Sequence, residues 1–126
     1  SPGATDKLLQ AAQHSSIPFL PGISSVSELM RGMEYGHRNF KFFPAEAAGG
    51  APVLKAMAGP FADVRFCPTG GIGLGNVMEY LALPNVLCVG GSWIAKPKLI
   101  QQKRWADIEQ LAREAAAIAA TGSTDD

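Results

Sequence analysis

The sequence predicts an α/β fold built on a parallel β-sheet. A short apolar segment followed by a helical segment recurs about every 22 to 25 residues, which is the length of a strand plus one helix. These apolar segments are nearly continuous, as strands buried on both faces require, and each ends at a Pro or Gly turn signal. The strands are expected at residues 17–20, 40–43, 64–67 and 86–89.

Amphipathic helices are expected between and after these strands. The clearest covers residues 26–35, where apolar side chains recur at helical spacing. Ser25 and Glu28 have the spacing of a capping box at its start, and Gly36 is placed to end it. Similar apolar stripes, whose Met and aromatic side chains are expected in the core, predict further helices at residues 52–58, 76–83 and 105–120.

The length and charge of the chain indicate one soluble domain, residues 1–126. The 126 residues carry 11 basic and 11 acidic side chains without a basic block, so no nucleic-acid partner is expected. No apolar run reaches the length of a membrane span, and residues 1–6 lack the features of a signal peptide, so an intracellular protein without a membrane partner is expected. Residues 121–126 lack apolar side chains and are expected to fray.

The cysteines and histidines show no spacing typical of a metal site. Cys67 and Cys88 lie in apolar strand-like segments without CxxC spacing, so we expect buried, reduced thiols. His14 and His37 lie in or after helices and are expected at the surface. No metal and no cofactor are predicted.

Lys41 is the main candidate for chemistry, because it lies alone in an aromatic strand. Side chains alternate along a strand, so Lys41 shares one face with Phe43 while Phe40 and Phe42 point to the other. Desolvation disfavours the lysine cation, and the neutral amine is the nucleophile that forms Schiff bases with carbonyl compounds. Two structural interpretations stay open: a lysine on an edge strand, or one whose ammonium group reaches water.

Paired glycines after the last two strands are candidates for an anion site. Such pairs let backbone N–H groups approach a phosphate, although ordinary tight turns also contain them. The periodicity fits both an open doubly wound sheet and part of a (β/α)₈ barrel, and the glycines favour the barrel, where phosphate binds after strands 7 and 8. The candidate residues are Thr69, Gly70, Gly71, Gly90, Gly91 and Ser92.

Taken together, these strand ends resemble a known enzyme family. Residues 1–3 (SPG), 17–24 (IPFLPGIS), 40–46 (FKFFPAE), 67–72 (CPTGGI) and 89–93 (VGGSW) are similar, in order and spacing, to motifs of the 2-keto-3-deoxy-6-phosphogluconate (KDPG) aldolase family. This family also cleaves 4-hydroxy-2-oxoglutarate. The resemblance implies a (β/α)₈ TIM barrel, of which this chain covers about the last four to five βα units. It further implies a cytoplasmic homotrimer that acts as a class I aldolase in the Entner-Doudoroff pathway.

The resemblance also implies a role for each candidate. Lys41 would attack the C2 ketone of the substrate or of pyruvate, and the iminium would withdraw electrons without a metal or cofactor. Pro2 and Phe43 would flank the pyruvyl group. The phosphate of the keto acid would bind at Gly70, Gly71, Gly91 and Ser92, with Thr69 and Gly90 alongside.

The same resemblance places part of the family's machinery outside this sequence. Residues 1–3 resemble the end of the fourth strand, whereas the family's acid/base glutamate, an arginine and a threonine lie on earlier strands. Glu46 is expected to be a loop or helix-start carboxylate and not the base. A half-barrel leaves open strand edges, so a truncated product of a longer gene is expected. The alternatives are an incomplete half-barrel that binds phosphorylated sugar acids or assembles with a missing half, and another phosphate-binding barrel enzyme such as an isomerase.

Overall fold

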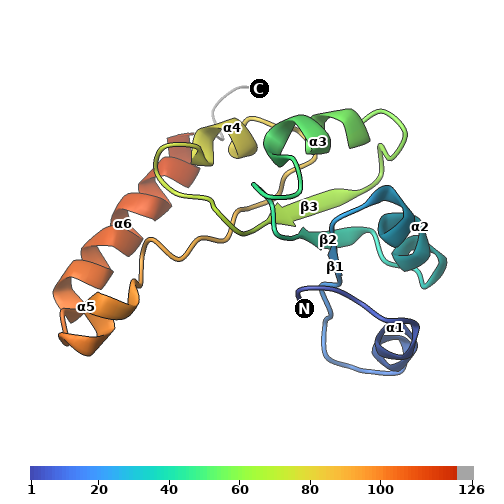
Figure 1. Cartoon of the computed structure of the whole chain (residues 1–126), viewed down its shortest axis with the longest axis horizontal. Helices are drawn as coiled ribbons and strands as arrows, with labels where there is room; N and C mark the ends of the chain where they lie inside the picture. The colour runs from blue at the N-terminus through green and yellow to red at the C-terminus, as the bar shows by residue number, and fades with distance from the viewer. Residues whose placement is uncertain (122–126) are drawn as a thin grey trace.

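A three-stranded parallel sheet forms the centre of the protein (Figure 1). The computed structural model describes the backbone of residues 1–121 and the side chains of residues 1–118. The strands β1 (Gly22–Ile23), β2 (Asn39–Phe42) and β3 (Arg65–Pro68) lie side by side in chain order. The predicted α/β class and parallel pairing are therefore confirmed, and β2 is the middle strand.

Helices follow the strands as the sequence predicts, with two additions. The Ser25–Glu28 capping box is present, and Gly36 after this helix has φ +87°. Two short helices had no clear pattern in the sequence. One begins at Asp6, with Thr5 as its N-cap, and buries only Leu9; the other begins at Pro97 and buries no side chain. The helices of the described chain are α1 (Asp6–Gln13), α2 (Val26–Glu34), α3 (Gly50–Met57), α4 (Val77–Leu81), α5 (Pro97–Gln101) and α6 (Trp105–Thr121).

Two of the predicted strands are wrong in position or extent. The first lies at Gly22–Ile23 and not at residues 17–20, where Pro18 has no N–H to donate to a ladder. The last, at residues 86–89, makes only isolated bridges that join Phe66 to Val86 and Thr69 to Gly90. This segment has one residue more than β3 between the two bridges, so a continuous ladder cannot form.

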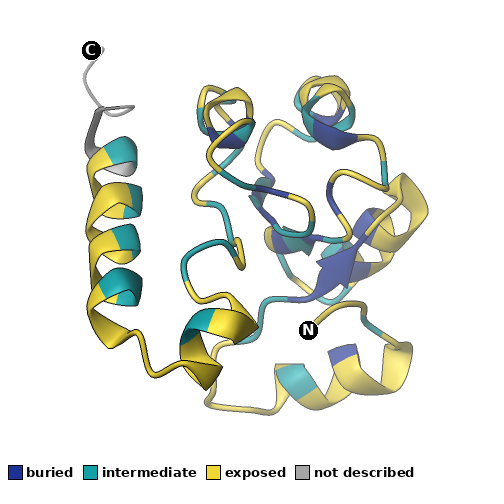
Figure 2. Ribbon diagram, turned by 60° about the vertical axis from the view of Figure 1, so that its left-hand side comes forward, coloured by how far each residue is buried: buried dark blue, intermediate teal, exposed yellow. Residues whose placement is uncertain are grey.

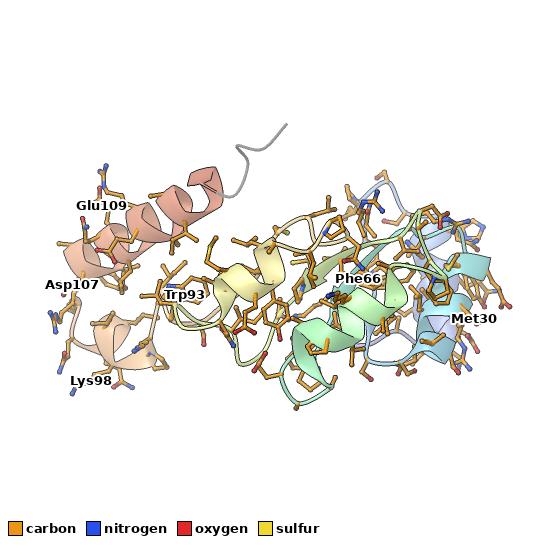
Figure 3. The ribbon with its side chains drawn as sticks, turned by 90° about the horizontal axis from the view of Figure 1, so that it is seen from above. Met30, Phe66, Trp93, Lys98, Asp107 and Glu109 are labelled. Atoms are coloured by element: carbon orange, nitrogen blue, oxygen red, sulfur yellow. The ribbon has the colours of Figure 1, made fainter. Side chains whose placement is uncertain are left out.

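The core lies on one face of the sheet, under α2, α3 and α4. Phe40, Phe42 and Phe66 point to this face and are fully buried, and Figure 3 shows Phe66 in the middle of the molecule. Gly32 lets α2 approach closely, because a Cβ there would lie 2.3 Å from Cε1 of Phe40. The helices contribute Leu29, Leu54, Met57, Val77 and Tyr80 to the same cluster.

The opposite face of the sheet is not covered to the same extent. Lys41 and Cys67 are half-buried there, and Cys88 is exposed. The expectation of strands buried on both faces is therefore wrong for the described chain, as is the expectation of a buried Cys88. Both cysteines are free thiols, as expected.

Several helix residues are less buried than their stripes predict. Val26 and Met30 are exposed on α2, and Met30 lies at the outer edge of the molecule (Figure 3). Trp105 of α6 is 58% exposed, while Ile118 packs against the core. The side of α6 that faces the rest of the chain is half-buried and its outer side is exposed (Figure 2). For Trp105 the physical reason is that α5 and α6 lie at the opposite end of the molecule from α1, where few described elements can cover them (Figure 1).

The predictions for the histidines and the tail have different outcomes. His14 is exposed, as predicted. His37 is half-buried, contrary to the prediction, because its ring packs edge-on against Phe19 and Phe40. Thr121 is the last residue of α6, and residues 122–126 lie outside the described part of the chain.

Candidate active site at the strand ends

Lys41 lies on the middle strand of the sheet, close to its carboxyl end. Its Cα is paired with Gly22 of β1 on one side and with Cys67 of β3 on the other. The structural interpretation as an edge-strand lysine is therefore wrong. The Nζ atom lies 4.9 Å from the centroid of the Phe43 ring, within the range of a cation–π contact. The strand thus presents the amine of Lys41 beside an aromatic ring, on the less covered face of the sheet.

A cavity of about 430 Å³ brings Lys41 together with the glycine turns. It lies where β2, β3 and the segment at residues 86–90 end, the usual place for a site in parallel α/β folds. Every residue predicted for substrate binding lines it except Pro2, and Ile72 was not predicted. The lining residues are Lys41, Phe43, Thr69, Gly70, Gly71, Ile72, Gly90, Gly91 and Ser92.

Pro2 lies beside β1 and does not line this cavity. The amino group of Ser1 donates a hydrogen bond to the Leu20 carbonyl oxygen at 2.9 Å. A Cβ on Gly22 would lie 2.3 Å from the carbonyl carbon of Pro2, so the absence of a side chain at Gly22 permits this approach. Pro2 therefore lies against Gly22, whose Cα is paired with that of Lys41.

The Gly70-Gly71 turn has a backbone that other residues rarely adopt. Gly70 has φ +101° and Gly71 has φ +78°. Backbone hydrogen bonds attach this turn to the loop after β2: the Ala45 N–H donates to the Thr69 carbonyl at 2.8 Å, and the Glu46 N–H donates to the Gly70 carbonyl at 3.1 Å. The two strand-end loops are thus held as one unit beside Lys41.

Thr69 lines the cavity and carries a buried hydroxyl. Its Oγ1 is buried and has no hydrogen-bond partner among the described residues. Its methyl group packs over Gly90, where a Cβ would lie 2.6 Å from Cγ2 of Thr69. Buried hydroxyls are normally hydrogen-bonded.

Two ionisable groups near the site have shifted pKa values. Burial, reinforced by a hydrogen bond with Cys88, raises the pKa of the Cys67 thiol to about 11, while the positive charge of Lys41 opposes this shift. Burial, followed by the hydrogen bond to Glu46, raises the pKa of Tyr80. Cys67 and Tyr80 therefore carry their protons at physiological pH.

Glu46 occupies the turn between β2 and α3, as expected, and its carboxylate is already engaged. The Tyr80 hydroxyl donates a hydrogen bond to Oε1 of Glu46. The side chain also packs on the Gly71 backbone, since a Cβ at Gly71 would lie 2.6 Å from Cγ of Glu46. No local sequence pattern predicts this pairing, because residues 46 and 80 are 34 positions apart.

The described part of the chain contains neither a cluster of metal ligands nor a membrane-spanning helix. Its His, Cys, Asp and Glu side chains form no group of three or more that could hold a metal ion. No helix of residues 1–121 is both long enough and apolar enough to cross a bilayer.

The comparison with protein families agrees with the geometry of the cavity. The model of the "KDPG and KHG aldolase" family matches residues 1–111. The chain belongs to this aldolase family. The match includes every residue that lines the Lys41 cavity.

Individual aldolases are also similar to this chain. The KDPG aldolase of Dickeya dadantii is 59% identical over 93% of the chain and 55% of its own length. The KHG/KDPG aldolase of Escherichia coli K12 is 57% identical over 91% of the chain and 54% of its own length. The chain thus spans about half the length of the curated relatives it matches.

A solved KDPG aldolase structure has the same fold over this region. The crystal structure from Legionella pneumophila superposes with a TM-score of 0.90 at 56% identity, over 91% of this chain and 56% of that one. In that crystal, pyruvate is captured at low pH as a covalent carbinolamine intermediate.

Proposed function

We propose that Lys41 is the Schiff-base lysine of a class I aldolase that cleaves KDPG to pyruvate and glyceraldehyde 3-phosphate. The observation that carries this proposal is the single cavity that holds both the Lys41 side chain and the two glycine turns. Such a site matches a substrate with a ketone at one end and a phosphate at the other. The names of the similar aldolases support this substrate, and the pyruvate carbinolamine in the Legionella enzyme supports a covalent mechanism.

The reaction follows from the chemistry of a neutral amine. The Lys41 Nζ adds to the C2 carbonyl carbon to give a carbinolamine, which loses water to form an imine. The protonated imine accepts the electron pair of the breaking C3–C4 bond, while the C4 hydroxyl loses its proton to a base and becomes the aldehyde. The resulting enamine gains a proton at C3, and water then hydrolyses the imine to release pyruvate and free Lys41.

The phosphate group of the substrate fits the glycine turns of the cavity. Positive-φ glycines such as Gly70 and Gly71 expose backbone N–H groups that can surround an anion. Thr69 lies beside these glycines in the cavity lining. Gly91 and Ser92 supply donors from the neighbouring segment on the same cavity wall. This arrangement binds phosphate with backbone and hydroxyl donors.

We assign no proton transfer to Glu46, because Tyr80 already occupies its carboxylate. The resemblance to the family implies an acid/base glutamate on strands that precede this segment. We further propose that the sheet is part of a (β/α)₈ barrel with Lys41 on the interior face. The consecutive parallel strands support this arrangement, as do α2, α3 and α4, which pack on the same face of the sheet.

Three finer properties belong to the same proposal. The enzyme also cleaves 4-hydroxy-2-oxoglutarate, a substrate suggested by the name of the E. coli relative. It forms a cytoplasmic homotrimer, as the family resemblance implies. Exposed apolar residues such as Leu87 and Trp105 are consistent with association, and sedimentation equilibrium of the purified protein measures the assembly directly.

The test is a turnover assay on the protein expressed from its own gene. Pyruvate release from KDPG is measured for the unmodified protein, for Lys41→Arg, and for Lys55→Arg as a matched control on the exposed face of α3. We expect Lys41→Arg to lower kcat by on the order of 10³-fold, since arginine cannot form the imine. Lys55→Arg should leave the rate unchanged. A Lys41→Arg enzyme with the parental rate would contradict the proposal.

A further inference from the structure

Tyr80 and Glu46 form a polar pair directly behind the Gly70-Gly71 turn. Tyr80 lies on α4 with no exposed surface, and its hydroxyl donates to Oε1 of Glu46. Neither residue lines the cavity that contains Lys41. A buried phenol whose hydroxyl bonds a carboxylate connects α4 to the loop after β2, two elements that are far apart in the sequence.

Glu46 touches the glycine turn through both its backbone and its side chain. Its N–H donates to the Gly70 carbonyl at 3.1 Å. Its Cβ and Cγ lie so close to Gly71 that an added methyl group there would come within 2.8 Å and 2.6 Å of them. Any movement of Glu46 therefore displaces the backbone of Gly70 and Gly71, which line the cavity.

The bond between Tyr80 and Glu46 is suited to a fixed support. A neutral hydroxyl that donates to a carboxylate makes a charge-assisted hydrogen bond, which is stronger than a bond between two neutral groups. Burial of Tyr80 raises the pKa of its phenol, so the donor keeps its proton throughout the working range of an enzyme.

We propose that Tyr80 and Glu46 are positioning residues that fix the Gly70-Gly71 turn for the substrate's phosphate and so set the preference for phosphorylated keto acids. The inference rests on the proposed function of the cavity. Backbone donors discriminate well only when they are held in place, and a shift of about 1 Å is costly. Because the pair does not contact Lys41, loss of the bond should affect phosphate binding and spare imine formation.

The experiment compares two substrates that differ in the phosphate. Tyr80→Phe removes only the hydroxyl, and Tyr35→Phe, at the C-cap of α2, is the matched control. In the protein expressed from its own gene, kcat and KM are measured with KDPG and with 4-hydroxy-2-oxoglutarate, which has no phosphate. Inorganic phosphate is used as a competitive inhibitor, and its dissociation constant is measured separately by calorimetry.

We expect Tyr80→Phe to raise the KM for KDPG and the dissociation constant of phosphate about tenfold, because the backbone donors of the turn would no longer be held in place. The kcat/KM for 4-hydroxy-2-oxoglutarate should stay within about twofold, and Tyr35→Phe should change neither substrate. Glu46→Gln keeps a weaker acceptor for Tyr80 and should shift the same constants in the same direction by a smaller factor.

Equal losses on both substrates, or unchanged phosphate binding in a folded Tyr80→Phe protein, would overturn the inference. If Tyr80→Phe does not fold, the Glu46→Gln variant provides the test. A folded Glu46→Gln protein with the parental dissociation constant for phosphate would refute the positioning role. Failure of the proposed function gives a different result, because the unmodified protein would then turn over neither keto acid. In that case the dissociation constant of phosphate, measured by calorimetry for the parent and the variants, still tests the positioning role.

Discussion

Gly71→Ala tests the geometry of the glycine turn most sharply. Gly71 has φ +78°, a conformation that is unfavourable for alanine. The new methyl group would also lie 2.6 Å from Cγ and 2.8 Å from Cβ of Glu46. Glu46 cannot easily move away, because its backbone bonds Gly70 and its carboxylate accepts from the buried Tyr80.

The size of the effect follows from these two contributions. A left-handed conformation costs an L-residue roughly 1–2 kcal/mol, and a methyl group forced into a close contact costs about 1–3 kcal/mol. Gly73→Ala is the matched control, because Gly73 lies in the same loop, has no left-handed φ, and has no atom within 4 Å of an added Cβ. Both variants lose the same glycine entropy in the unfolded chain, so that contribution cancels between them. We therefore expect Gly71→Ala to be about 2–5 kcal/mol less stable than Gly73→Ala.

The assay is urea unfolding of both variants, followed by circular dichroism and fitted with a common slope. Calorimetry with inorganic phosphate is carried out on the folded proteins. We expect Gly71→Ala to bind phosphate more weakly than the parent and Gly73→Ala to bind it normally. The reasoning is refuted if the two variants unfold within about 0.5 kcal/mol of each other, the range of an ordinary surface substitution.

Three further substitutions or reactions test separate parts of the structure. Glu28→Ala should lower the free energy of unfolding by ~0.5 kcal/mol at pH 7. Hydrogen bonding, chiefly from the Ser24 backbone, lowers the pKa of Glu28 below 4.5. The loss of stability should therefore be complete above pH 4.5 and should disappear as the pH falls through the lowered pKa. Urea unfolding at several pH values measures this, and a constant deficit would contradict it. Gly32→Ala should lower the free energy of unfolding, measured by thermal unfolding, by about 1–3 kcal/mol, because its methyl group would clash with the buried Phe40 ring. This loss is expected despite the better helix propensity of alanine. A variant as stable as the parent would contradict the close packing of α2 on Phe40. Iodoacetamide at pH 8 should alkylate Cys88 at least about tenfold faster than Cys67, because burial raises the pKa of Cys67 to about 11. Peptide mass spectrometry measures both rates, and equal rates would contradict the difference in reactivity between the two thiols.

The parts of the fold that depend on local patterns could be predicted from the sequence. The capping box at Ser25 and Glu28 is a four-residue signal, and the structure contains it. The alternation in residues 40–43 placed Lys41 and Phe42 on opposite faces of β2, and their burial agrees. The chain order of the strands and the glycine turns then brought Lys41 and Gly70 to one cavity.

The parts that depend on distant contacts could not be predicted. Cys88 looks like a core residue in its apolar segment, but its burial depends on what covers that face of the sheet. The segment at residues 17–20 has strand composition, yet the pairing begins at Gly22. The bond between Tyr80 and Glu46 joins residues from different βα units, and neither residue type is specific enough to predict it.

The most direct test of the central claim is reductive trapping of pyruvate. The protein expressed from its own gene is incubated with pyruvate and sodium borohydride, digested, and mapped by peptide mass spectrometry. A stable secondary amine on the peptide that contains Lys41, absent when borohydride or pyruvate is omitted, is the predicted result. Trapping at another lysine, or no trapping under conditions where the protein turns over its keto acid, would contradict the assignment of Lys41.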